Sequence, residues 1–181
     1  MKGKKGIILG FFILLLIAVI ILIISGGNDM STKKLSKIIK RGNLDDLNLT
    51  IYYMDPSILS YFPQNVDNLI SFSYEHKIII DGSKLEEQID LLNEMCTVNL
   101  MPVEHKSRLD ARLYYVFATK SNRKIFDVAI WGKNKSMFVN GIEIYENDIF
   151  YDVIKPFLPE DVLRLFKNTF KYEEARINST P

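Results

Sequence analysis

The stretch LDARLYYVFATKSNRKIFDVAIW, residues 109–131, decides the fold. Hydrophobic and polar side chains alternate in Leu109–Thr119, and the return stretch Lys124–Trp131 alternates in the same way. Residues 121–123 lie between them and have turn-forming side chains. Because successive side chains of a strand point to opposite faces, the pattern predicts an antiparallel hairpin of two long strands.

The two faces of this hairpin differ in character. The first predicted face carries core residues, namely Leu109, Ala111, Leu113, Tyr115, Phe117, Phe126, Val128 and Ile130. The opposite face holds Arg112, Tyr114, Asp127 and Trp131, and these residue types often anchor interfaces. Two interpretations stay open: the four residues form a ligand- or partner-binding patch, or a helix covers this face and makes Tyr114 and Trp131 part of the core. The same choice applies to a second aromatic group, Tyr52, Tyr53, Tyr61 and Phe62.

Flanking segments extend the predicted sheet and add helices. Residues 49–54 predict a strand, and the unbroken isoleucines of His76–Asp81 predict a strand buried on both faces. Ser83 and Glu86 have the spacing of a capping box at the start of a helix. Asn140-Gly141 predicts a tight hairpin turn, and two short helices before and after Pro156 close the domain. The sequence therefore predicts an α+β domain with a mostly antiparallel sheet of about five strands, packed by two or three helices.

Residues 7–24 are uncharged and strongly apolar. As a helix they would reach ~27 Å, close to the ~30 Å hydrocarbon core of a bilayer. We therefore expect a short basic tail at residues 1–6 and a transmembrane helix at residues 7–24. Cleavage of a signal peptide near Ser25 is the alternative. The single cysteine, Cys96, lies far from the apolar run, so a lipid-modified cysteine is not expected.

Residues 25–46 predict a basic juxtamembrane linker or amphipathic helix. Leu35, Ile38 and Ile39 share one side of it, and the bases that surround them are Lys33, Lys34, Lys37, Lys40 and Arg41. These five side chains are the expected contacts with an anionic membrane surface, and an ordinary solvated connector is the alternative. The α+β domain is expected at residues 47–171, followed by a flexible tail at residues 172–181.

Charge is unevenly distributed along the chain. Residues 1–41 carry a net charge of +7 and residues 42–181 a net charge of −6. An acidic domain does not suit a nucleic-acid partner, whose phosphates require clustered bases. The lysines beside residue 7 favour a cytoplasmic N-terminus and an extracytoplasmic domain, whereas the larger number of bases in residues 33–41 favours the reverse. We expect a single-pass protein of the cell membrane with its domain outside.

No catalytic or cofactor-binding pattern stands out. His76, Cys96 and His105 are too far apart in sequence to match metal-ligand spacing, and no glycine cluster opens a helix. We therefore expect no metal and no cofactor. His76 with Asp81, or His105 with Asp110, remains the basis of an alternative in which an envelope-acting hydrolase uses a histidine as base.

Three stretches of the chain carry a resemblance to other proteins, namely Asp67–Asn93, Leu109–Phe117 and Val139–Asp161. They resemble a group of small, uncharacterised proteins of Gram-positive bacteria that have an N-terminal membrane segment. The resemblance implies a bacterial, single-span, extracytoplasmic protein and transfers no activity. The expectation is thus a non-catalytic binding or interaction domain whose partners are the bilayer and an envelope component or another membrane protein. A structural subunit of a membrane complex is a further alternative.

Overall fold

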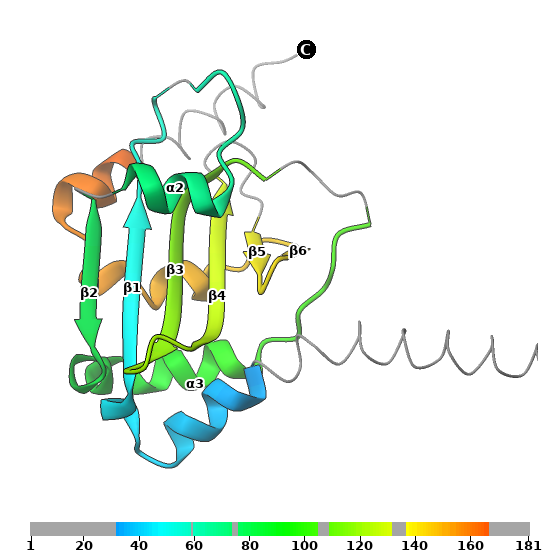
Figure 1. Ribbon diagram of the computed structural model, residues 1–181. Helices are drawn as coiled ribbons and strands as arrows, with labels where there is room; N and C mark the ends of the chain where they lie inside the picture. The colour runs from blue at the N-terminus through cyan, green and yellow to red at the C-terminus, as the bar shows by residue number, and fades with distance from the viewer. Residues whose placement is uncertain (1–31, 59, 74–75, 105–108, 132–136, 167–181) are drawn as a thin grey trace, which may run out of the picture.

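The computed structural model describes residues 32–58, 60–73, 76–104, 109–131 and 137–166, and these form an α+β domain (Figure 1). Their six-stranded sheet is antiparallel throughout and has the order β2-β1-β3-β4-β5-β6. The strands are β1 (Leu47–Tyr53), β2 (Lys77–Asp81), β3 (Ala111–Thr119), β4 (Lys124–Trp131), β5 (Met137–Val139) and β6 (Ile142–Ile144). The helices are η1 (Leu44–Asp46), α2 (Val66–Phe72), η2 (Gly82–Gln88), α3 (Ile89–Thr97), α4 (Ile149–Asp152) and η3 (Lys155–Phe157), together with helical residues 32–40 and 160–166.

The hairpin predicted from residues 109–131 forms the centre of the sheet. Its strands β3 and β4 pair in register around Tyr115 and Val128, and β1 pairs on the other side of β3. Asn140 and Gly141 both have positive φ, which confirms the predicted tight turn between β5 and β6. The α+β prediction is therefore confirmed, with six strands among the described residues instead of about five.

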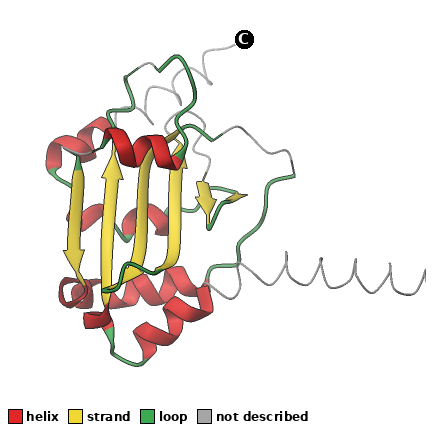
Figure 2. Cartoon of the chain, in the orientation of Figure 1, coloured by secondary structure: helices red, strands yellow, loops and turns green. Residues whose placement is uncertain are grey.

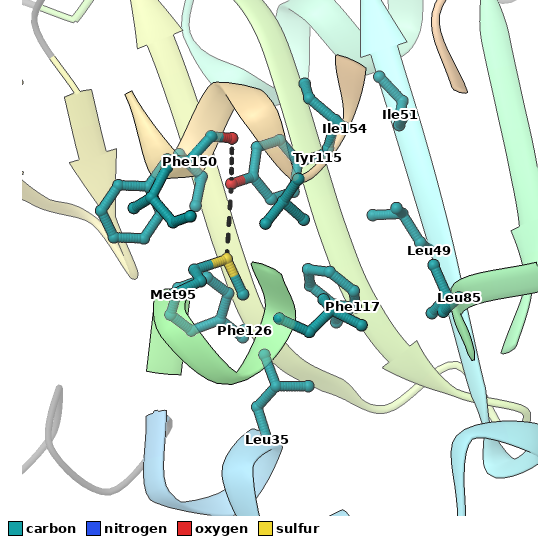
Figure 3. Packing of buried hydrophobic residues seen from close by; sticks show 14 of the residues in the cluster. Leu35, Leu49, Ile51, Leu85, Met95, Tyr115, Phe117, Phe126, Phe150 and Ile154 are labelled. Atoms are coloured by element: carbon teal, nitrogen blue, oxygen red, sulfur yellow. Dashed lines mark hydrogen bonds between the residues drawn. The ribbon is translucent and has the colours of Figure 1, made fainter. Parts of the chain in front are cut away.

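The sheet separates two apolar clusters. The larger lies on the face that packs against α3, α4 and residues 32–40 and 160–166, while the smaller lies beneath α2 (Figure 2). Tyr115 is fully buried in the larger cluster, and its hydroxyl donates to the Phe150 carbonyl oxygen at 2.7 Å (Figure 3). A sheet with one apolar cluster on each face forms three layers, and this explains why few strand residues remain exposed.

Two irregularities in β3–β4 pairing redistribute side chains between these clusters. Ala111 pairs with Trp131 and Leu113 with Ile130, so Arg112 has no residue opposite it. This bulge places Ala111 in the cluster beneath α2, whereas alternation had predicted that it shares a face with Leu113. A second shift leaves Ile125 as the extra residue, and it joins the larger cluster.

Residues 32–40 belong to the folded domain. Leu35 and Ile39 are buried in the larger cluster, and Leu44 of η1 joins them. The expected domain start at residue 47 is therefore corrected, because the apolar side of this helix packs on the sheet domain and not on lipid. Its five bases, Lys33, Lys34, Lys37, Lys40 and Arg41, are all exposed.

The segment after β1 also departs from expectation. β2 lies at the edge of the sheet, and its Ile79 is 62% exposed, so the prediction of a strand buried on both faces is wrong. The helix that follows begins as the 3-10 helix η2, which Asp81 caps by accepting from the Ser83 amide at 3.2 Å. Ser83 is therefore not the capping residue that the sequence predicted. Gly82 allows this close packing, since a Cβ there would collide with the Leu44 carbonyl oxygen.

The membrane segment lies outside this description. No helix among the described residues is long and apolar enough to span a bilayer, and residues 7–24 are not among those residues. The tail predicted at residues 172–181 is also outside them.

Candidate functional site: the face of the sheet beneath α2

Helix α2 lies across one face of the sheet, above β1, β3 and β4 (Figure 1). Asn65 caps its start by accepting from the Asn68 amide at 2.7 Å. Leu69 is completely buried beneath it, in a cluster with Ala111, Tyr114 and Ala129. The helix therefore covers the region in which the sequence placed a binding patch.

This cover corrects the expectation of an exposed patch. Arg112, Tyr114 and Asp127 are only 4%, 4% and 8% exposed. Tyr114 instead follows the alternative in which a helix covers the face, and its ring lies 6.0 Å from that of Tyr52. Trp131 pairs with Ala111 through its backbone, and its side chain is outside the described part of the structure. A binding role for the four residues stays a prediction.

Arg112 is the centre of the first buried polar network. Its guanidinium donates to Asp110 at 3.0 Å, to the Ser60 hydroxyl at 3.1 Å and to the Met54 sulfur at 3.1 Å. The other carboxylate oxygen of Asp110 accepts a hydrogen bond from the backbone N–H of Gln64 at 2.8 Å. The network therefore ties Met54, Ser60 and Gln64, three residues of the segment after β1, to the bulge in β3.

A second network surrounds Asp127. Its Oδ2 accepts from the Tyr114 hydroxyl at 3.3 Å, and its Oδ1 lies 3.2 Å from the Lys124 ammonium. The Asn140 side chain accepts from the Asp127 amide at 3.1 Å, which fixes the β5–β6 turn to β4. Burial raises the pKa of the Tyr114 hydroxyl well above its ordinary value, and the negative charge of Asp127 adds to the effect. Tyr114 therefore acts as a neutral hydrogen-bond donor.

Large apolar side chains are exposed beside the first network. In the loop of residues 54–65, Tyr61 is fully exposed, Phe62 is 74% exposed and Ile58 is 51% exposed. Phe72 of α2 is 66% exposed. We call these four residues the exposed apolar set. The second aromatic group predicted from the sequence is divided, since Tyr52 and Tyr53 are half-buried.

Sequence reasoning had no basis for grouping Ile58 and Phe72 with Tyr61 and Phe62. The loop and α2 lie at the same end of the sheet, above the strands in Figure 1, although up to fourteen positions separate their residues in sequence. The sequence shows only that these four residues are apolar and lie in a segment without strand alternation. Whether they are exposed depends on how the segment is attached to the sheet. The attachment through Arg112 is visible only in the structure.

The histidine pairs considered from the sequence are not supported where they can be seen. His76 is exposed and directly precedes β2, and its ring lies 5.2 Å from that of Tyr53. Asp81 ends the same strand, so five residues of extended chain place it ~16 Å away, on the other face. His105 is outside the described residues. Within the described ranges, no group of three or more His, Cys, Asp or Glu residues is arranged to hold a metal ion.

Comparisons of the chain with protein-family models, curated proteins and solved structures gave no match.

Proposed function

We propose that this chain is a non-catalytic interaction domain, held at the outer face of a bacterial membrane by residues 7–24, that binds a protein of the envelope through the exposed apolar set. The observation that carries the proposal is the rigid support of that set. Ile58, Tyr61 and Phe62 are exposed in a loop whose neighbouring residues are held by the buried ion pair of Arg112 and Asp110.

The support matters because exposed apolar side chains on a fixed backbone lose little entropy when they bind. Aromatic side chains also contribute much of the energy at protein interfaces. Asp67 is exposed and Asp55 is half-buried in the same part of the chain. The matching partner surface is therefore an apolar hollow with basic residues at its rim.

A topology measurement tests the membrane part of the proposal. Glu87 is exposed in η2, so Glu87→Cys in a Cys96→Ser background offers a single reactive thiol. A membrane-impermeant maleimide should label it in intact cells. Labelling only after the cells are opened would place the domain in the cytoplasm and overturn the extracytoplasmic assignment.

Site-specific photo-crosslinking tests the interaction surface. A benzophenone amino acid at Tyr61 of the full chain should give one discrete adduct in whole cells, while the same group at Glu94, an exposed residue of α3, should not. Phe62→Asp should remove the Tyr61 adduct and leave the thermal melt unchanged, because Phe62 is mostly exposed. Equal adducts at both positions, or an adduct that survives Phe62→Asp, would contradict a specific surface.

A further inference from the structure

The two edges of the sheet, β6 and β2, differ in how far other segments of the chain pair with them. Residues 101–103 cover the β6 edge: Pro102 bridges Ile144, the Val103 amide donates to Glu143 at 3.1 Å, and the Tyr145 amide donates to Met101 at 3.1 Å. At the opposite edge, β2 pairs with β1 alone among the residues that the structure describes. Ile79, in the middle of β2, is 62% exposed. The outward backbone groups of an edge strand are a template for pairing with another strand.

The backbone groups at this edge have a definite pattern. The Tyr53 amide donates to the His76 carbonyl oxygen at 3.2 Å, so His76 directs its carbonyl group towards β1. In an antiparallel pair this direction alternates along the strand. Ile78 and Ile80 therefore also bond to β1, while Lys77 and Ile79 direct their amide and carbonyl groups outwards. Asp81 directs its amide outwards, and its carbonyl oxygen accepts the first hydrogen bond of η2, which Asp81 caps.

The charges at the two ends of β2 are complementary to each other. Lys77 and Asp81 are both exposed, and they lie two residues to either side of Ile79. If a second β2 runs antiparallel with Ile79 opposite Ile79, each Lys77 lies opposite an Asp81. The two Ile79 residues then form a hydrogen-bonded pair, and the Asp81 amide of each copy faces the Lys77 carbonyl oxygen of the other in this same register. The same register therefore satisfies the backbone hydrogen bonds, the apolar contact between the two Ile79 side chains and the pairing of Lys77 with Asp81.

We propose that β2 pairs with β2 of a second copy of this chain, in the antiparallel register centred on Ile79, so that the two sheets become one continuous sheet. The two-fold axis is perpendicular to the joined sheet, and both copies therefore present the same face to the same side. Residues 25–31 could reach up to ~25 Å, which lets both copies of residues 7–24 enter one membrane parallel to that sheet. The pairing does not depend on the partner proposed for the exposed apolar set.

Disulfide trapping in native membranes tests both the occupant and the register. In the Cys96→Ser full chain, Ile79→Cys should form a homodimer on oxidation, because facing residues of a hydrogen-bonded pair have Cα atoms ~5.5 Å apart, within disulfide range. Lys77→Cys is the matched control on the same strand and face. Its two copies would lie ~14 Å apart along the strands and should not cross-link.

Charge reversal provides an independent measurement. Lys77→Glu places a glutamate opposite Asp81 twice in each dimer and should lower the cross-linked fraction of Ile79→Cys roughly tenfold. Lys37→Glu, at an exposed residue of the 32–40 helix, is the control and should leave the fraction unchanged. Because Lys77 also lies 5.5 Å from the Tyr52 ring, the thermal melt of each variant shows whether the fold is intact.

Three results would overturn the proposal. Cross-linking at Lys77→Cys equal to that at Ile79→Cys would show random collision. An Ile79→Cys adduct with the mass of a different protein would show that another chain occupies the edge. No homodimer at Ile79→Cys, with an intact fold, would show that β2 does not pair with itself.

Discussion

Replacing Arg112 by methionine should destabilise the domain strongly, because this residue holds the loop beneath the exposed apolar set. Methionine keeps most of the side-chain length but removes the hydrogen bonds to Asp110, Ser60 and the Met54 sulfur. The Asp110 side chain is 13% exposed and would be left with the Gln64 amide as its only described partner. Removing one member of a buried ion pair costs ~3–5 kcal/mol, and the slight exposure of Asp110 favours the lower end of that range.

The assay is urea unfolding of the full chain in detergent, followed by the fluorescence of Trp131, which is the only tryptophan of the sequence. Arg112→Met should lower the midpoint without changing the denaturant slope, and hydrogen exchange should become faster in residues 54–65. Arg123→Met, an exposed arginine at the end of the same hairpin, should change the free energy of unfolding by less than about 0.5 kcal/mol.

A double-mutant cycle isolates the ion pair from the other contacts. Asp110→Asn keeps an acceptor for the Gln64 amide, so Arg112→Met combined with Asp110→Asn should cost less than the two single changes together by about 1–3 kcal/mol. A cost below about 1 kcal/mol for Arg112→Met, with unchanged exchange in residues 54–65, would refute the reasoning. The loop would then be held by something other than Arg112.

Three further changes test other parts of the structure. Tyr115→Phe should cost about 1–3 kcal/mol of unfolding free energy, because it leaves the buried Phe150 carbonyl without its 2.7 Å donor, whereas Tyr145→Phe at a 58% exposed residue should have almost no effect. Gly82→Ala should lower the melting temperature by the equivalent of about 3 kcal/mol or more, since the new methyl group would collide with the Leu44 backbone, and a near-normal melt would contradict that contact. Burial raises the pKa of the Cys96 thiol to about 11, so iodoacetamide should modify it slowly at pH 8 in the folded protein and rapidly in urea. Because the folded state disfavours the Cys96 thiolate, the stabilisation from keeping this thiol protonated is complete below pH 9, and the free energy of unfolding falls as the pH rises above 9. Equal modification rates in the folded protein and in urea would contradict the burial of Cys96.

The candidate site could be predicted in part. Alternation along β3 and β4 placed Arg112, Tyr114 and Asp127 away from the main core, and Tyr114 and Asp127 do meet there. Their burial could not be predicted, because it depends on α2, whose seven residues carry little periodic signal. The bulge at Arg112 was equally invisible, since it is set by pairing between two strands and not by either strand alone.

Local sequence by itself determined the strands, their turns and the α+β class. Alternation is a property of a single strand, and the positive φ of Asn140 and Gly141 is a property of two residues, so both can be read along the chain. The tertiary structure alone decided that the isoleucine-rich β2 lies at an edge, that residues 32–40 join the core and that Arg112 anchors a loop more than forty positions away. These features depend on which surfaces remain uncovered after all the elements have packed, and hydrophobicity along the sequence shows only that a surface is apolar, not what covers it.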